Sequence, residues 1–248
     1  MDGGARLEAP LLFALELTIL YAAGYYAMGH LLRISGFGGS GSVLGRMVFY
    51  LLVFPGVVLH EGAHYLACVL TGTRVSRFAP FSPGRSNDGR LVLGYVRHER
   101  RRFPIGAIIG LAPIILNPLG LLVLTALLTP LTFREVVNPS VRVIVEAIFE
   151  SGFLTHTPLL AAIWGYLSLS FALGSVPSRE DLSSLPVLLL VFGGCVLLVG
   201  LLRTGSDGVL ASAIDDLSAL AAGLYALPAT VAAVAALSVG LAGRAIRY

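Results

Sequence analysis

Apolar runs of about twenty residues recur along the chain, and they restrict its fold more than any other feature of the sequence. This is the length that an α-helix needs to cross the hydrocarbon core of a bilayer. Such runs lie at residues 10–32, 43–71, 104–128, 157–176, 185–202 and 208–242. The last run is expected as one long helix broken at Pro228 or as two shorter helices. The sequence therefore predicts an all-α polytopic membrane protein with about six transmembrane helices.

The composition agrees with a membrane protein and excludes several other classes. Hydrophobic residues make up 56% of the chain and charged residues 12%, whereas soluble proteins carry about 25% charged residues. The first apolar run is too long for the core of a cleavable signal, so we expect it to be the first span. Cys68 and Cys195 lie in apolar runs and offer neither a disulfide framework nor metal-ligand spacing. No phosphate-binding loop or dinucleotide fingerprint is present, and no nucleic-acid partner is expected.

The long polar stretch, residues 72–103, indicates how the chain is oriented. Eight arginines lie between Arg74 and Arg102, against Asp88 and Glu99 alone. Because positively charged loops stay inside, we expect this loop in the cytoplasm of a multi-pass cell-membrane protein. Residues 90–96 have strand character after a turn at 87–89, and residues 74–78 can pair with them as a short β-hairpin.

The segment His60-Glu61-Gly62-Ala63-His64 is an HExxH sequence inside the second apolar run. In a helix, positions i and i+4 project from the same face, so both imidazoles can hold one metal ion. Glu61 points about 100° away, where it can activate a water molecule but not bind the metal. We therefore expect one zinc ion per chain, bound by His60 and His64. The alternative is a proton or cation relay, since buried ionisable groups in a membrane mark such paths.

A hydrolytic zinc site needs a third protein ligand, and Asp181 is the favoured candidate. With alternating spans, the polar turn at residues 177–184 returns to the cytoplasmic side, where His60 and His64 also lie. Asp181 can instead cap the next helix. Three other carboxylates remain open as ligands: Glu180, Glu146 and Glu150.

Several segments together resemble the site-2 protease family of intramembrane zinc metalloproteases. The HExxH segment, with Leu59 before it, resembles the catalytic helix of that family. Gly94-Tyr95-Val96 is similar to the strand that follows it, and Gly110-Leu111-Ala112-Pro113 with Asn117 is similar to the start of the next helix. Residues 177–181 occupy the place of the Leu-Asp-Gly motif, whose Asp is a zinc ligand. Asp181 lies in Ser-Arg-Glu-Asp-Leu instead, so the chain resembles a divergent member.

The resemblance implies a zinc-dependent endopeptidase that cleaves membrane-embedded or membrane-proximal proteins or peptides. Glu61 would be the general base and Asn117 would orient substrate or stabilise an oxyanion. Leu91, Leu93, Gly94 and Tyr95 would hold an extended substrate by strand addition. The whole chain would be one domain: a first span at 10–32, a catalytic core at 43–185 and C-terminal helices at 186–248. Two other functions fit the residues: an inactive zinc-binding membrane scaffold, and an ion- or proton-conducting transporter.

Overall fold

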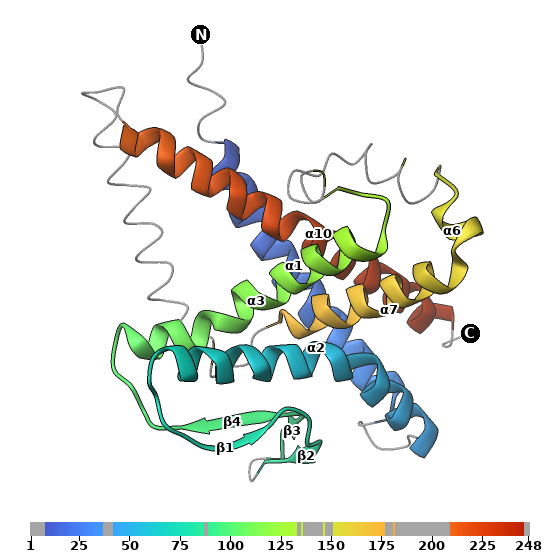
Figure 1. Ribbon diagram of the computed structural model, residues 1–248. Coiled ribbons are helices and arrows are strands. Elements are labelled where there is room, and N and C mark those ends of the chain that lie inside the picture. The colour runs from blue at the N-terminus through green and yellow to red at the C-terminus, as the bar shows by residue number, and fades with distance from the viewer. Residues whose placement is uncertain are drawn as a thin grey trace.

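The computed structural model (Figure 1) describes residues 8–36, 42–86, 89–132, 135, 146, 151–176, 181 and 209–245. Within these ranges the chain is mostly helical. Its helices are α1 (Glu8–Ile34), α2 (Val43–Leu70), α3 (Ile105–Leu128), α6 (Phe153–His156), α7 (Pro158–Gly174) and α10 (Val209–Ala245). Pro228 lies inside α10, which is a single helix. The chain therefore has the helical membrane-protein character that the sequence predicts.

The prediction of about six spans is not confirmed, and the count in the described part of the chain is lower. Three helical segments there are long and apolar enough to cross a membrane: α2, α3 and residues Ala222–Leu241 of α10. Helix α7 is apolar but has only 17 residues, fewer than the roughly 20 that a span needs. Helix α1 forms where the first span was expected, but it carries Glu16 and His30 and is not among the three. The run at residues 185–202 lies outside the described residues.

The polar loop forms two short antiparallel strand pairs beside α2 (Figure 1). Strand β1 (Val75–Ala79) pairs with β4 (Tyr95–His98), and β2 (Gly84–Arg85) pairs with β3 (Leu91–Val92). The expected hairpin thus forms only in part, because the expected strand at residues 90–96 divides between two partners. It divides at Leu93 and Gly94, where the Leu93 carbonyl accepts a hydrogen bond from the Ser82 amide at 2.7 Å.

Helix α2 packs against both α3 and α7. The contacts of Leu59 with Gly120 and of His64 with Ile109 show that α2 and α3 run in opposite directions. Helices α2 and α7 run in the same direction, and their backbones nearly touch where Gly56 meets Ser170. Helices α1 and α10 pack along each other and complete the bundle (Figure 1).

Three prolines inside the packed helices each remove a hydrogen bond, and a side chain from another helix replaces it. A proline has no N–H, so the carbonyl four residues earlier loses its helical donor. Pro55 deprives the Leu51 carbonyl in this way, and the Tyr166 hydroxyl donates to it at 2.6 Å. Pro118 and Pro113 in α3 similarly deprive the carbonyls of Ile114 and Ile109. These accept from Tyr225 of α10 at 2.6 Å and from His64 of α2 at 2.8 Å.

Candidate metal centre

His60 and His64 lie one turn apart on α2, and their ring centroids are 5.0 Å from each other. Asp181, which lies beyond the end of α7, reaches the same point. Its Oδ2 atom is 3.3 Å from Nε2 of His60, and its Oδ1 atom is 3.0 Å from Nε2 of His64. One ligand atom from each residue falls within 4.8 Å of the other two. The structure therefore brings together the three residues that the sequence nominates as ligands.

Two backbone carbonyls fix which ring nitrogen of each histidine faces Asp181. Nδ1 of His60 lies 2.8 Å from the Gly174 carbonyl, and Nδ1 of His64 lies 2.8 Å from the Ile109 carbonyl. A carbonyl only accepts, so each Nδ1 carries the hydrogen and each Nε2 of the neutral ring presents a lone pair. Both lone pairs then face the carboxylate, and electron-rich atoms so close together require a cation between them. That cation is either a proton on each ring or a metal ion.

Helix chemistry explains why these two carbonyls are available. Gly174 is the last residue of α7, and the last four carbonyls of a helix have no donor within it. The Ile109 carbonyl is available because Pro113 follows it by four residues. Each ligand histidine of α2 is thus held by a carbonyl of another helix, and that carbonyl has no donor within the helix to which it belongs. Such outer contacts orient the rings and raise their basicity toward a metal.

The donor set and its spacing suit zinc. Nitrogen and carboxylate ligands bind Zn²⁺ at about 2.0–2.1 Å in a tetrahedron, which places two ligand atoms about 3.3 Å apart. The His60 and His64 contacts with Asp181, at 3.3 and 3.0 Å, are close to that spacing. The group is also well shielded, since His60 is 9% and Asp181 3% exposed. Charged groups buried in a membrane cost several kcal/mol unless they are paired or bind a metal.

Glu61 lies beside the group and directly against the polar loop. Its carboxylate is within electrostatic range of His64. A Cβ atom built on Gly94 would come within 2.7 Å of Glu61 Cγ and 2.7 Å of the Pro80 carbonyl oxygen. A glycine at position 94 therefore leaves room for the Glu61 side chain, and any residue with a Cβ atom would crowd it. This contact places the break between β3 and β4 at the expected general base.

The other residues of the expected substrate strand make different contacts, and their role in holding substrate stays a prediction. Leu91 and Leu93 pack against the core cluster that contains Phe49 and Val53. The guanidinium groups of Arg77 and Arg97 both lie over the Tyr95 ring, 5.6 and 5.2 Å from its centroid. Gly94 is the residue of this expected strand that contacts Glu61, beside the ligand group.

Asn117 is completely buried on α3, one turn after Pro113. Neither its amide nitrogen nor its amide oxygen has a hydrogen-bond partner among the described residues. Most buried polar groups are paired, so an amide of this kind requires a water, an ion or a substrate group. Its role as a substrate-orienting residue stays a prediction.

The remaining candidate ligands do not join the group. Glu146 is outside it, while Glu150 and Glu180 lie outside the described residues. Cys68 is fully buried and packs against Ala67 and Ile109, as expected for a small core residue.

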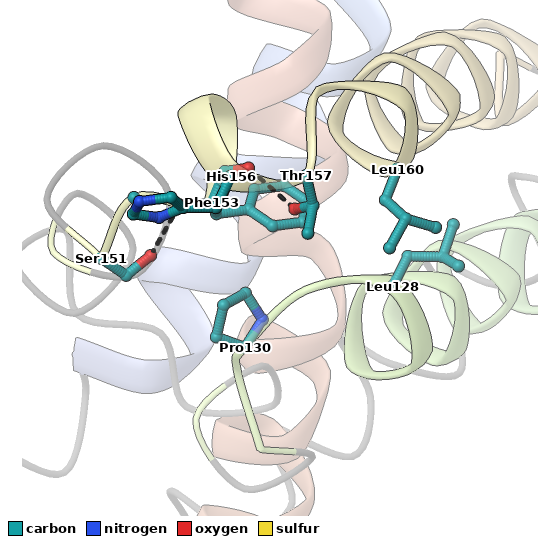
Figure 2. A pocket seen from close by; sticks show the side chains of 8 residues that line it. Leu128, Pro130, Ser151, Phe153, His156, Thr157 and Leu160 are labelled. Atoms are coloured by element: carbon teal, nitrogen blue, oxygen red, sulfur yellow. Dashed lines mark hydrogen bonds between the residues drawn. The ribbon is translucent and has the colours of Figure 1, made fainter.

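A separate pocket of about 320 Å³ lies at the other ends of α3 and α7 (Figure 2). Its lining includes Leu128 at the end of α3, His156 of α6 and Leu160 near the start of α7. Since Ile109 and Gly174, at the opposite ends of these helices, hold the two ligand histidines, the pocket is not part of the metal centre.

No family model matches the chain, and neither do any curated proteins or solved structures. The centre therefore has to be judged on its own geometry. Sequence reasoning missed the carbonyls that hold the histidines, although the four-residue interval from Ile109 to Pro113 was a readable signal for one of them.

Proposed function

We propose that this chain is an intramembrane zinc metalloprotease of the site-2 protease type. His60, His64 and Asp181 would bind one zinc ion, and Glu61 would be the general base. The observation that carries the proposal is the convergence of three ligand atoms within 4.8 Å of one another, two of them from α2, a helix long and apolar enough to cross a membrane. A site-2-type enzyme would need such a ligand group on a membrane-spanning helix.

The residues would divide the work of peptide hydrolysis as follows. A zinc ion in this group would polarise the scissile carbonyl and acidify a water molecule toward pKa 7 or so. Glu61 would take the proton of the attacking water and pass it to the leaving amine. The carbonyls of Ile109 and Gly174 would keep His60 and His64 in the tautomer that leaves Nε2 available. Asn117 would donate to the substrate carbonyl through its amide, which has no hydrogen-bond partner in the described part of the chain.

The substrate would be a membrane-embedded or membrane-proximal polypeptide that enters as an extended strand. Support comes from the contact of Gly94, just before β4, with Glu61, the residue proposed as the general base. An extended peptide that pairs beside Gly94 would bring its backbone carbonyls past the metal. The arginines of the loop favour a cytoplasmic entry for water and for product release.

The test is a comparison of zinc content and cleavage in purified protein. Wild type and Glu61→Gln would be reconstituted in nanodiscs, counted for zinc and incubated with single-span substrates. We expect one zinc per chain in both proteins and cleavage by wild type alone. Glu99→Gln is the matched control, because the exposed Glu99 side chain pairs with Arg101 and is not part of the ligand group; this variant should retain cleavage.

The outcomes separate the competing functions. Stoichiometric zinc with no cleavage that depends on Glu61 would refute the protease and favour a zinc-binding scaffold. Absence of zinc together with proton or cation flux through wild-type vesicles would favour a transporter. Full zinc occupancy in Asp181→Ala would move the third ligand to another residue.

A further inference from the structure

Helix α1 packs against the end of α7 that lies beside the candidate metal centre, although nothing in its sequence suggests that it does. A Cβ atom on Gly24 would collide with the Val176 side chain, just beyond α7. Tyr21 precedes Gly24 by three residues and therefore lies on the same face of α1. That face is directed toward the end of α7, where the Gly174 carbonyl holds His60.

The Tyr21 hydroxyl is buried and has no hydrogen-bond partner among the described residues. It lies within electrostatic range of the Asp181 carboxylate and of the Tyr225 hydroxyl. Tyr225 has a partner, the Ile114 carbonyl, so its own hydrogen is already donated. Tyr21 thus retains a hydrogen to donate inside the bundle, close to a carboxylate. A buried hydroxyl in this condition calls for a functional reason.

Metal binding would change which groups donate hydrogen bonds to the Asp181 carboxylate. In the structure both of its oxygens face a histidine Nε2 atom. Once the Nε2 atoms bind a metal ion, they carry no hydrogen to donate to the carboxylate. Carboxylates that bind a metal are usually hydrogen-bonded by outer groups, which hold the binding oxygen in place.

We propose that Tyr21 is a positioning residue of the metal centre, whose hydroxyl donates to the Asp181 oxygen that does not bind the metal. The inference rests on the metal centre of the proposed function but not on proteolysis. It assigns α1 a part in holding the metal in addition to its packing against α10.

The test measures zinc affinity, which does not depend on cleavage. Tyr21→Phe removes only the hydroxyl, and its zinc dissociation constant would be measured in nanodiscs by competition with a chelator of known affinity. We expect a 10- to 100-fold higher constant, the range found for lost outer-shell partners. Tyr25→Phe is the matched control, since Tyr25 lies on the same helix and is 73% exposed; its constant should equal that of wild type. The visible spectrum of the Co²⁺-loaded protein should shift for Tyr21→Phe alone.

A double variant separates positioning from folding. In an Asp181→Asn background, Tyr21→Phe should change the zinc dissociation constant by less than twofold, because the charged acceptor is gone. An equal zinc affinity of Tyr21→Phe and wild type would overturn the inference, as would a full effect of Tyr21→Phe in the Asp181→Asn background. Wild type without zinc would defeat the proposed function itself. Normal zinc in wild type with an unaffected Tyr21→Phe would defeat only the inference.

Discussion

Replacing Pro113 with alanine should loosen the metal while it strengthens the helix. The new amide N–H can donate to the Ile109 carbonyl, which now accepts from Nδ1 of His64 at 2.8 Å. The helix then regains the bond that proline removed, and a proline inside a helix costs about 3 kcal/mol relative to alanine. The thermal unfolding midpoint of the metal-free protein should therefore rise. The gain in the free energy of unfolding should stay below about 3 kcal/mol.

The zinc dissociation constant should rise in the same variant. A carbonyl has two lone pairs, so His64 would share its acceptor and not lose it outright. The net worth of a hydrogen bond is about 0.5–1.5 kcal/mol, and about 1.4 kcal/mol corresponds to a factor of ten. Because the bond is weakened and not lost, we expect an increase of up to roughly 12-fold, measured by chelator competition in nanodiscs.

Pro118→Ala is the matched control for this reasoning. Pro118 lies in the same helix, is equally buried and frees the Ile114 carbonyl for Tyr225, which is not a ligand. It should raise the unfolding midpoint in a similar way and leave zinc affinity unchanged. Equal zinc constants for the two proline variants would refute the idea that the Ile109 carbonyl holds His64 for the metal.

Three further outcomes are expected. Gly94→Ala should abolish cleavage but retain zinc, since its Cβ would come within 2.7 Å of Glu61 Cγ; Gly84→Ala, which meets nothing nearer than 3.9 Å, should cleave normally. Tyr166→Phe should destabilise the fold in a bilayer by about 1–3 kcal/mol, because it leaves the Leu51 carbonyl without its donor on an exposed side of the α2–α7 contact, where lipid offers no replacement; unchanged stability in a denaturation series would count against this. Removal of zinc by a chelator should lower the unfolding midpoint, since zinc at 100 times its dissociation constant contributes about 2.7 kcal/mol; an unchanged midpoint would contradict the metal centre.

The sequence predicts α2 and α3 to within two residues, because each is one apolar run with clear ends. Ser42 caps the first residues of α2 through its hydroxyl, which accepts from the Gly45 amide. The spacing of His60 and His64 likewise follows from local helix geometry alone. Local signals of this kind do not depend on the rest of the fold.

Features that depend on distant partners were not predictable in the same way. The expected strand at residues 90–96 divides next to Gly94, which meets Glu61, a residue more than thirty positions earlier in the chain. The place of Tyr21 depends on how α1 crosses the end of α7, and no local pattern encodes that crossing. The apolar length of α1 suggested a span, but composition alone does not determine whether a helix faces lipid or its neighbours.

The proline-deprived carbonyls also bear on how the bundle assembles in a membrane. Lipid offers no water to such a carbonyl, so an isolated α2 or α3 would hold an unmet acceptor at membrane depth. The Leu51 carbonyl gains a donor only when α7 packs against α2. The Ile109 carbonyl gains one from α2, and the Ile114 carbonyl gains one from α10. Each of these contacts forms at one axial register of two helices. The carbonyls that the prolines leave open thus help to select the partner helix and its register in lipid, where apolar surfaces alone discriminate poorly. One of these contacts, between α2 and the Ile109 carbonyl of α3, also orients His64.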